Sequence, residues 1–174
     1  MHFREAQLND TERILTLYKT VAATPGGIAR LEHEVTEEYV RAFVERSVSD
    51  GLIIVCEDPS NPDRLIAELH AYRSRLSVFR HVYTDLTLVV HPDHQGRKIG
   101  KTIFTIFLEE ISRHRSDVGK VELITREGNT NAISLYLSLG FVIEGRMEMR
   151  IKTPSGTYEA DIPMGWTNPN FEFD

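Results

Sequence analysis

An apolar strand followed by an amphipathic helix and a second strand constrains the fold of this chain more than any other feature. Residues Val82–Val90 are mostly aliphatic or β-branched and predict a long central strand. Apolar side chains then recur at helical spacing over Ile99–His114, and Val121–Thr125 predicts the next strand. A connection through one helix places the two strands parallel in one sheet. The chain is therefore predicted to have an α/β fold.

The remaining pattern adds strands and helices on both sides of this segment. Asn9 and Asp10 are good caps for a first helix, which the Thr24–Gly27 segment must break. The Asp58–Asp63 segment has the composition of a turn. The other predicted elements are a strand at 3–7, a helix from Thr36 with Val40, Phe43, Val44 and Val48 inward, strands at 52–56 and 65–72, a helix at 129–139 and a hairpin of 141–151 with 158–164. No linker or repeat interrupts the pattern, so residues 1–174 are expected to form a single domain.

Composition argues against several classes of protein. The 20 Lys and Arg against 26 Asp and Glu give a formal charge of −6, which argues against binding to nucleic acid or to an anionic membrane. Cys56 is the only cysteine, so an internal disulfide framework is impossible. The N-terminus lacks the apolar core of a signal peptide, and no run of about 18 apolar residues could span a bilayer. A cytoplasmic location is the simplest expectation.

The segment between the central strand and the following helix has the chemistry of an anion-binding site. Gly96 lies in a short polar loop, and Arg97, Lys98 and Lys101 surround the start of the helix. Unpaired backbone N–H groups and the helix dipole favour an anion there, and a diphosphate is the expected ligand. A surface turn with a basic rim is the alternative. A P-loop does not fit, because Gly96 and Gly100 stand one residue too close together.

This stretch resembles the signature of the GCN5-related N-acetyltransferase superfamily, Gln/Arg-x-x-Gly-x-Gly/Ala after a strand ending in Val-x-Pro. Gln95, Gly100, Val90 and Pro92 match that signature. Lys98 stands where the superfamily has glycine, and it could either add a charge to the site or weaken cofactor binding. The resemblance implies a mixed, mostly antiparallel central sheet, with a parallel pair splayed at the cofactor site and helices flanking it. It also implies that acetyl-CoA is held by Leu88, Val89, Val90, Gln95, Gly96, Arg97, Lys98, Ile99, Gly100, Lys101 and Asn129.

A second motif lies on the helix predicted at 129–139. Asn129 caps this helix and Gly140 ends it. The pattern Asn-x-x-Ala-x-x-Leu-Tyr-x-x-x-Gly-Phe over residues 129–141 is similar to the second hallmark of the same superfamily. The resemblance implies that the tyrosine of this motif, Tyr136, protonates the departing thiolate of the coenzyme. A half-buried packing role is the alternative for this side chain.

Acetyl transfer to an amine also needs a group that accepts a proton. Alternation along the central strand places Asp85 on the same face as Tyr83 and Val89, and an acid inside such an apolar strand is unusual. Asp85 is therefore the leading candidate for the base, directly or through a water, and an ion pair with a basic neighbour such as Arg73 or Arg80 is the alternative. Glu122 is the second candidate. No His or Cys cluster has the spacing of a metal site, so direct transfer without a metal is expected.

The sequence defines the amine acceptor less well. Arg30 could hold a carboxylate of the acceptor, and Glu68, Tyr72 and Tyr158 are further candidate contacts. The closing hairpin at 158–164 resembles the branch of the superfamily that acetylates small molecules. An amino acid, a polyamine or a related metabolite is therefore the expected acceptor.

Three alternatives to this function stay open. Lys98 at the glycine position of the signature is compatible with a non-catalytic acyl-CoA-binding protein. Acetylation of protein N-termini is the alternative to acetylation of a small molecule. Nucleotide binding by the Gly96–Lys101 loop would predict stabilisation by ATP instead of acetyl-CoA. Apolar groups at Trp166 and at residues 171–173 predict packing against the domain or against a second copy, so a homodimer is expected.

Overall fold

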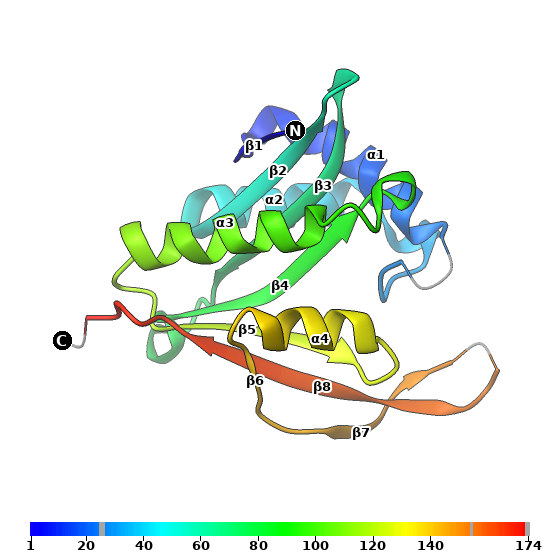
Figure 1. Cartoon of the computed structure of the whole chain (residues 1–174). Coiled ribbons are helices and arrows are strands. Elements are labelled where there is room, and N and C mark those ends of the chain that lie inside the picture. The colour runs from blue at the N-terminus through cyan, green and yellow to red at the C-terminus, as the bar shows by residue number, and fades with distance from the viewer. Residues whose placement is uncertain (25–26, 154, 173–174) are drawn as a thin grey trace. The chain divides into compact units, whose positions relative to one another are not determined.

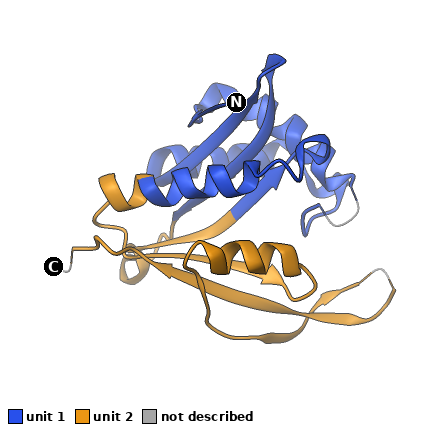
Figure 2. Cartoon of the chain, viewed as in Figure 1, with its two compact units in different colours: residues 1–72, 87–109 blue, residues 73–86, 110–174 orange. Residues whose placement is uncertain are grey.

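The computed structural model describes residues 1–24, 27–153 and 155–172. Its strands form a mixed sheet, mostly antiparallel, with one parallel pair and with helices flanking it, so the predicted fold class is confirmed. The chain divides into two compact units, unit 1 (residues 1–72 and 87–109) and unit 2 (residues 73–86 and 110–174), as Figure 2 shows. Strand β4 (Val82–Val90), which has the predicted bounds, contributes its first half to unit 2 and its second half to unit 1.

Unit 1 has a sheet of strands with helices on both faces. Its elements are β1 (His2–Glu5), η1 (Leu8–Asp10), α1 (Thr11–Ala22), η2 (Glu32–Glu34), α2 (Glu37–Asp50), β2 (Gly51–Asp58), β3 (Asn61–Arg73), the end of β4, η4 (Pro92–His94) and most of α3 (Ile99–His114). β1 pairs with β2 and β2 pairs with β3, both antiparallel. α1 and α2 cover one face of these strands, and α3 lies over the other face (Figure 1).

Helix α2 illustrates why these residues form these elements. The Thr36 side chain accepts a hydrogen bond from the Tyr39 N–H at 3.1 Å and caps the helix, and two glutamates follow in the first turn. The predicted buried stripe is confirmed at Val40, Phe43 and Val44. It is wrong at Val48, which is 44% exposed, whereas Ser47 is buried. Position 47 lies two turns from Val40 on the same face, and position 48 has rotated away from it.

The turn between β2 and β3 is tighter than its composition predicted. β2 extends through Asp58 and β3 begins at Asn61, so the expected six-residue turn and the strand start at 65 are both wrong. The Asp58 carboxylate closes the turn by accepting from the Ser60 hydroxyl at 2.7 Å and the Ser60 N–H at 2.9 Å. These hydrogen bonds lower the pKa of Asp58 to about 2. Because the side chain satisfies the local backbone, two residues suffice for the reversal.

Unit 2 is built around the long strand β8. Its elements are η3 (Ser77–Phe79), the first half of β4, the end of α3, β5 (Lys120–Arg126), α4 (Thr130–Ser138), β6 (Val142–Ile143), β7 (Met147–Lys152) and β8 (Tyr158–Thr167). β4 pairs with β5 in parallel, and β5, β6 and β7 all pair with β8 in antiparallel orientation. α4 ends before Gly140, whose φ is +92°, as its sequence predicted.

The strand predicted at 141–151 is wrong as a continuous element, because it is split into β6 and β7. The partner strand carries Pro163, which has no N–H to donate to a ladder. The Pro163 carbonyl instead accepts from the Glu144 N–H at 2.9 Å, after β6 has ended. A second irregularity lies at Met149 in β7, where φ is +54° and the pairing register shifts.

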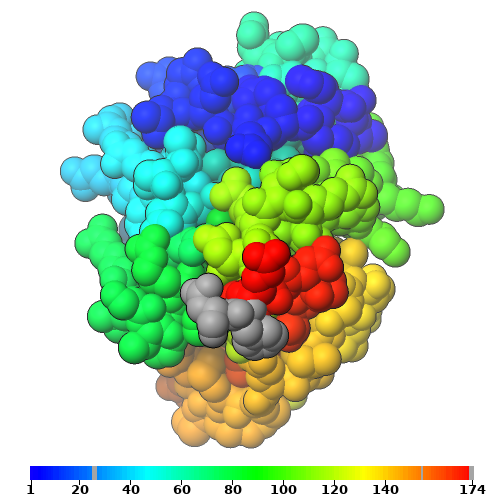
Figure 3. Space-filling view, turned by 90° about the vertical axis from the view of Figure 1, so that its left-hand side faces the viewer, coloured from blue at the N-terminus to red at the C-terminus, as the bar shows by residue number. Residues whose placement is uncertain are grey.

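The apolar residues near the C-terminus pack within unit 2. Trp166 is buried, and the Phe171 ring lies 6.1 Å from the His81 ring. The Glu172 N–H donates to the Ser116 carbonyl at 3.0 Å, and Figure 3 shows this C-terminal segment on the surface beside the chain that follows α3. Phe173 lies outside the described residues, as do Pro25 and Gly26 of the predicted helix break. The homodimer stays a prediction.

None of the helices in the described part of the chain combines the length and the apolar character that crossing a membrane requires.

Candidate active site

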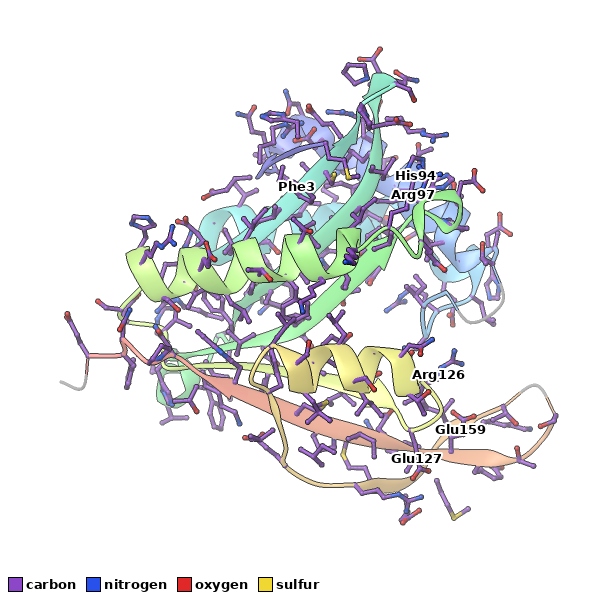
Figure 4. All side chains as sticks on the ribbon, in the orientation of Figure 1. Phe3, His94, Arg97, Arg126, Glu127 and Glu159 are labelled. Atoms are coloured by element: carbon purple, nitrogen blue, oxygen red, sulfur yellow. The ribbon has the colours of Figure 1, made fainter. Side chains whose placement is uncertain are left out.

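The end of β4 and the loop after it are held firmly within unit 1. The His91 N–H donates to the Ile66 carbonyl of β3 at 2.8 Å, and the His91 ring accepts from the Asp93 N–H at 3.3 Å. His94 is 2.9 Å from a guanidinium nitrogen of Arg64. Figure 4 shows His94 and Arg97 on this loop, between β4 and α3. The loop therefore enters the helix from a fixed anchor.

The backbone of the loop presents its amide groups to solvent. Gly96 and Lys98 both have a left-handed backbone, with φ of +72° and +63°, and residues 95–98 are exposed. Among the described residues, the first backbone hydrogen bond at the start of α3 runs from the Thr102 N–H to the Lys98 carbonyl, at 3.0 Å. The amides of residues 96–101 donate to no backbone carbonyl in that part of the chain. Amides left open in such a turn form an anion-binding concavity.

Helix α3 packs on β4 directly after this loop. A Cβ atom added to Gly100 would lie 3.5 Å from the Leu88 side chain and 3.7 Å from that of Val90, which is ordinary contact. Ile99, by contrast, is buried in the core. The Gln95 side chain donates to the Val90 carbonyl at 3.3 Å and closes the end of the strand. The predicted cofactor-binding residues from Leu88 to Lys101 thus form one continuous segment of unit 1.

Lys98 occupies a backbone conformation that favours glycine. A left-handed conformation costs an L-residue roughly 1–2 kcal/mol because Cβ approaches the following carbonyl oxygen. This cost explains why the superfamily signature has glycine at this position, because glycine has no Cβ. Lys98 retains the conformation and carries its charge into solvent beside Arg97 and Lys101.

Asp85 interrupts β4 where the parallel pairing stops. The β4–β5 ladder comprises the pairs Val82–Lys120 and Tyr83–Val121, and Asp85 follows with φ of +55°. The strand is buried at Tyr83 and next at Leu86, so the predicted alternation through Asp85 is wrong. A positive φ inside a strand marks a bulge, and bulges occur often beside active sites. Asp85 is exposed at this bulge.

Two residues were considered together with Asp85: Arg73 as its ion-pair partner and Glu122 as a second candidate base. Arg73 forms an ion pair with Asp117 at 2.5 Å, within unit 2. Glu122 is half-exposed and lies 3.7 Å from the ammonium group of Lys120. Its surroundings are those of a solvated sheet face, as alternation along β5 predicted.

Tyr136 is held in a largely buried position on α4. The Asn129 side chain caps this helix by accepting from the Ala132 N–H at 3.3 Å. The Tyr136 ring is 9% exposed and lies 6.0 Å from the Phe141 ring. Burial raises the pKa of Tyr136 to about 12, so the phenol keeps its proton at neutral pH and can donate it.

The candidate acceptor contacts Arg30, Glu68 and Tyr72 meet in an aromatic cluster of unit 1. Tyr39, Phe43, His70 and Tyr72 follow one another at centroid distances of 5.4, 4.1 and 5.9 Å. Guanidinium groups lie 3.8 Å from the ring centroids at both ends, Arg30 on Tyr39 and Arg46 on Tyr72.

Glu68 lies beneath the aromatic cluster and is fully buried. It accepts from the Tyr18 hydroxyl at 2.6 Å and lies 2.9 Å from His70 Nδ1. A substrate could reach Glu68 only by displacing these partners. Tyr158, the fourth candidate, is 55% exposed and belongs to unit 2. Sequence reasoning missed Tyr18 and Arg46, although the i, i+2, i+4 spacing of Glu68, His70 and Tyr72 on one strand was a usable signal.

Known proteins that are similar to this chain are acyltransferases in one family and in one curated relative. Residues 16–141 match the Acetyltransferase (GNAT) family. The chain is 35% identical over 149 residues to L-amino acid N-acyltransferase MnaT of Escherichia coli (strain K12), covering 84% of this chain and 83% of MnaT. A shorter match to UPF0157 protein YqkA of Bacillus subtilis (strain 168) is 39% identical over 61 residues and covers 35% of this chain but 17% of YqkA.

Solved structures of low sequence identity share the fold. An acetyltransferase of the GNAT family from Streptococcus pneumoniae has a TM-score of 0.84 at 18% identity, covering 95% of this chain and 98% of that one. The protein yncA from Salmonella typhimurium, solved with its cofactor acetyl-CoA, has a TM-score of 0.81 at 20% identity, covering 100% of this chain and 96% of that one.

The fold and the strand-to-helix loop are those of an acyltransferase, and the matched residues identify its family. The chain belongs to the Acetyltransferase (GNAT) family.

Proposed function

We propose that this protein transfers an acetyl group from acetyl-CoA to the primary amine of a small molecule, by direct transfer in a ternary complex. The observation that carries the proposal is the open segment of residues 96–101, left-handed at Gly96 and Lys98, whose amides donate to no backbone carbonyl in the described chain. Three exposed cationic residues, Arg97, Lys98 and Lys101, belong to this same segment. Such a loop fits a diphosphate, which coenzyme A contains.

The binding residues in unit 1 divide into two groups. The amides between Gln95 and Lys101 hold the diphosphate, with Ile99 buried beneath them as the anchor of the helix. The end of β4, at Leu88, Val89 and Val90, contacts the adjoining arm of the coenzyme. In unit 2, Asn129 fixes the start of α4 and thereby the place of Tyr136 on that helix.

When bound, acetyl-CoA supplies the acetyl group as a thioester, and its transfer releases a thiolate. Tyr136 donates its phenolic proton toward that sulfur, because its raised pKa keeps the phenol protonated. Asp85, which is exposed at the bulge of β4, accepts the proton that the amine must lose, directly or through a water. No side chain forms an acyl intermediate in this scheme. Cys56 in particular is buried, and burial raises the pKa of its thiol to about 11.

Two observations support a small amino compound as the acceptor. The relative MnaT is named an L-amino acid N-acyltransferase. The Arg30 guanidinium carbon lies 3.8 Å from the centroid of the Tyr39 ring, and a guanidinium that stacks on an aromatic ring can still bind a carboxylate through its N–H groups. Tyr72 and Tyr158 are further proposed contacts of the acceptor.

Thiol release with a panel of amines tests the proposal. The panel contains free L-amino acids, polyamines and peptides with a free N-terminus, each with acetyl-CoA. We expect turnover with small amines, and we expect Tyr136→Phe to lower kcat by at least about tenfold. The stabilisation by coenzyme A should remain the same in this variant, since the ring is retained. An unchanged kcat would contradict the assigned role of Tyr136.

A non-catalytic acyl-CoA-binding protein is the second candidate, and the strained Lys98 is the observation that favours it. It predicts that coenzyme A raises the melting temperature although no amine of the panel is turned over. Multiple turnovers with any amine exclude it. Turnover restricted to the peptides would instead indicate a protein N-terminal acetyltransferase.

A further inference from the structure

Glu159 on β8 has a carboxylate that the rest of the described chain does not satisfy. Its Oε2 atom is buried and has no hydrogen-bond partner. The residue as a whole is half-buried, and no ion pair joins it to any described residue. Because Oε1 is not enclosed in the same way, that oxygen is the edge a ligand could contact.

The carboxylate lies against the turn that leads from β5 into α4. A Cβ atom added to Gly128 would be 3.2 Å from both carboxylate oxygens of Glu159, closer than ordinary contact. The Glu127 N–H donates to the Ala160 carbonyl at 2.9 Å, which holds β8 to this turn. Figure 4 shows Glu127 and Glu159 close to this turn. Glycine at position 128 is what allows the carboxylate to approach the backbone.

Two neighbouring carboxylates, one in this turn and one on β8, are paired with arginine. Glu127 accepts two hydrogen bonds from Arg146, at 2.9 and 2.8 Å. Asp161 lies 3.5 Å from Arg150 Nε. Glu159 thus differs from both neighbours in lacking a cation within the described chain. A buried carboxylate oxygen without a donor is costly, which is why such groups in folded proteins have partners or receive them from a ligand.

We infer that Glu159 binds the ammonium group of the amine acceptor. The inference rests on the proposed function and narrows it, because the acceptor must then arrive as a cationic primary amine. An ammonium at Oε1 supplies both the charge and the N–H donors that the carboxylate lacks. The carboxylate is already in place in the free protein, so binding does not require it to reorganise.

The test compares Glu159→Gln with Glu127→Gln, which removes the same charge from a neighbouring carboxylate that has its arginine. We expect Glu159→Gln to raise Tm by about 3 °C, because it removes a half-buried charge that has no partner among the described residues. We expect its KM for the best amine of the panel to rise at least about tenfold, with the Kd for coenzyme A unchanged. Glu127→Gln should raise neither Tm nor the KM for the amine.

Two further measurements separate the possible results. Glu159→Asp keeps the negative charge on a side chain that is shorter by one methylene group. Its KM for the amine should therefore lie between those of the wild type and Glu159→Gln. The thermal shift produced by the same amine, with coenzyme A present, should be lost in Glu159→Gln. A raised Tm with an unchanged KM and an unchanged amine shift would overturn the inference. Failure of the wild-type protein to acetylate any amine would instead overturn the proposed function on which it rests.

Discussion

Replacing Lys98 by glycine tests whether the loop conformation is imposed by the fold at a cost. At φ of +63°, the left-handed backbone destabilises the folded state by roughly 1–2 kcal/mol for a non-glycine residue. Glycine avoids this cost but lowers the free energy of unfolding by about 0.5–1 kcal/mol, because its backbone has more entropy in the unfolded chain. The difference predicts that Lys98→Gly increases the free energy of unfolding by about 0.5–1 kcal/mol. For a chain of this size that raises Tm by about 2 °C.

Thermal unfolding of three variants, with and without coenzyme A, provides the assay. Lys98→Ala removes the same charge and keeps the strained backbone, so it should show no such rise in Tm. Gly96→Ala is the converse change at φ of +72°, where an added Cβ meets no atom within 4 Å. Its expected loss of about 1 kcal/mol is therefore purely conformational. A lower Tm for Lys98→Gly, or an unchanged Tm for Gly96→Ala, would refute the argument from backbone strain.

Three more outcomes are expected. Gly100→Ala should leave Tm within about 2 °C, because its Cβ meets atoms at ordinary contact. It should weaken coenzyme A binding at least about tenfold in calorimetry, since the added methyl lies beside Leu88 and Val90, which are proposed to contact the coenzyme. The pKa of Tyr136 is raised from about 10 to about 12. The protonated phenol therefore contributes about 2–3 kcal/mol to the free energy of unfolding below pH 10, and this contribution is lost between pH 10 and 12. In alkaline unfolding, Tyr136→Phe should lose less stability than the wild type over that range. Asp10 accepts hydrogen bonds from Arg4 at 2.8 Å, and its pKa is lowered although burial opposes the shift. Asp10→Asn should therefore lower the free energy of unfolding by about 3 kcal/mol near pH 7, measured by denaturant titration. The difference from the wild type should shrink as the pH falls below about 4.

Local sequence signals predicted the elements that propensity and capping decide. The bounds of β4 and α3 agree with the structure, because aliphatic β-branched runs and helical spacing are long and uninterrupted there. Asn129 was identifiable as a cap, and Gly140 as a helix end, since each acts on backbone groups within a few residues. The loop at Gly96 was recognisable for the same reason.

Other features depend on contacts that no local pattern contains. The turn at Asp58 is short because a side chain folds back on its own backbone, and Pro163 splits β6 from β7 although it lies in the partner strand. The bulge at Asp85 disrupts an alternation that looked regular in sequence. Each of these follows from hydrogen bonds between residues whose pairing is known only once the sheet has formed.

The sequence by itself determined the family, the order of most strands and helices, and the position of the loop with Gly96 and three cationic residues between β4 and α3. These features are written in short stretches whose backbone preferences are local. The tertiary structure decided which candidate side chains have partners: it buried Glu68 beneath Tyr18, and among the described residues it gave Glu159 Oε2, beside Gly128, no hydrogen-bond partner. Burial and pairing depend on residues far apart in the chain, and for that reason only the folded molecule distinguishes a carboxylate oxygen that has a donor from one that has none.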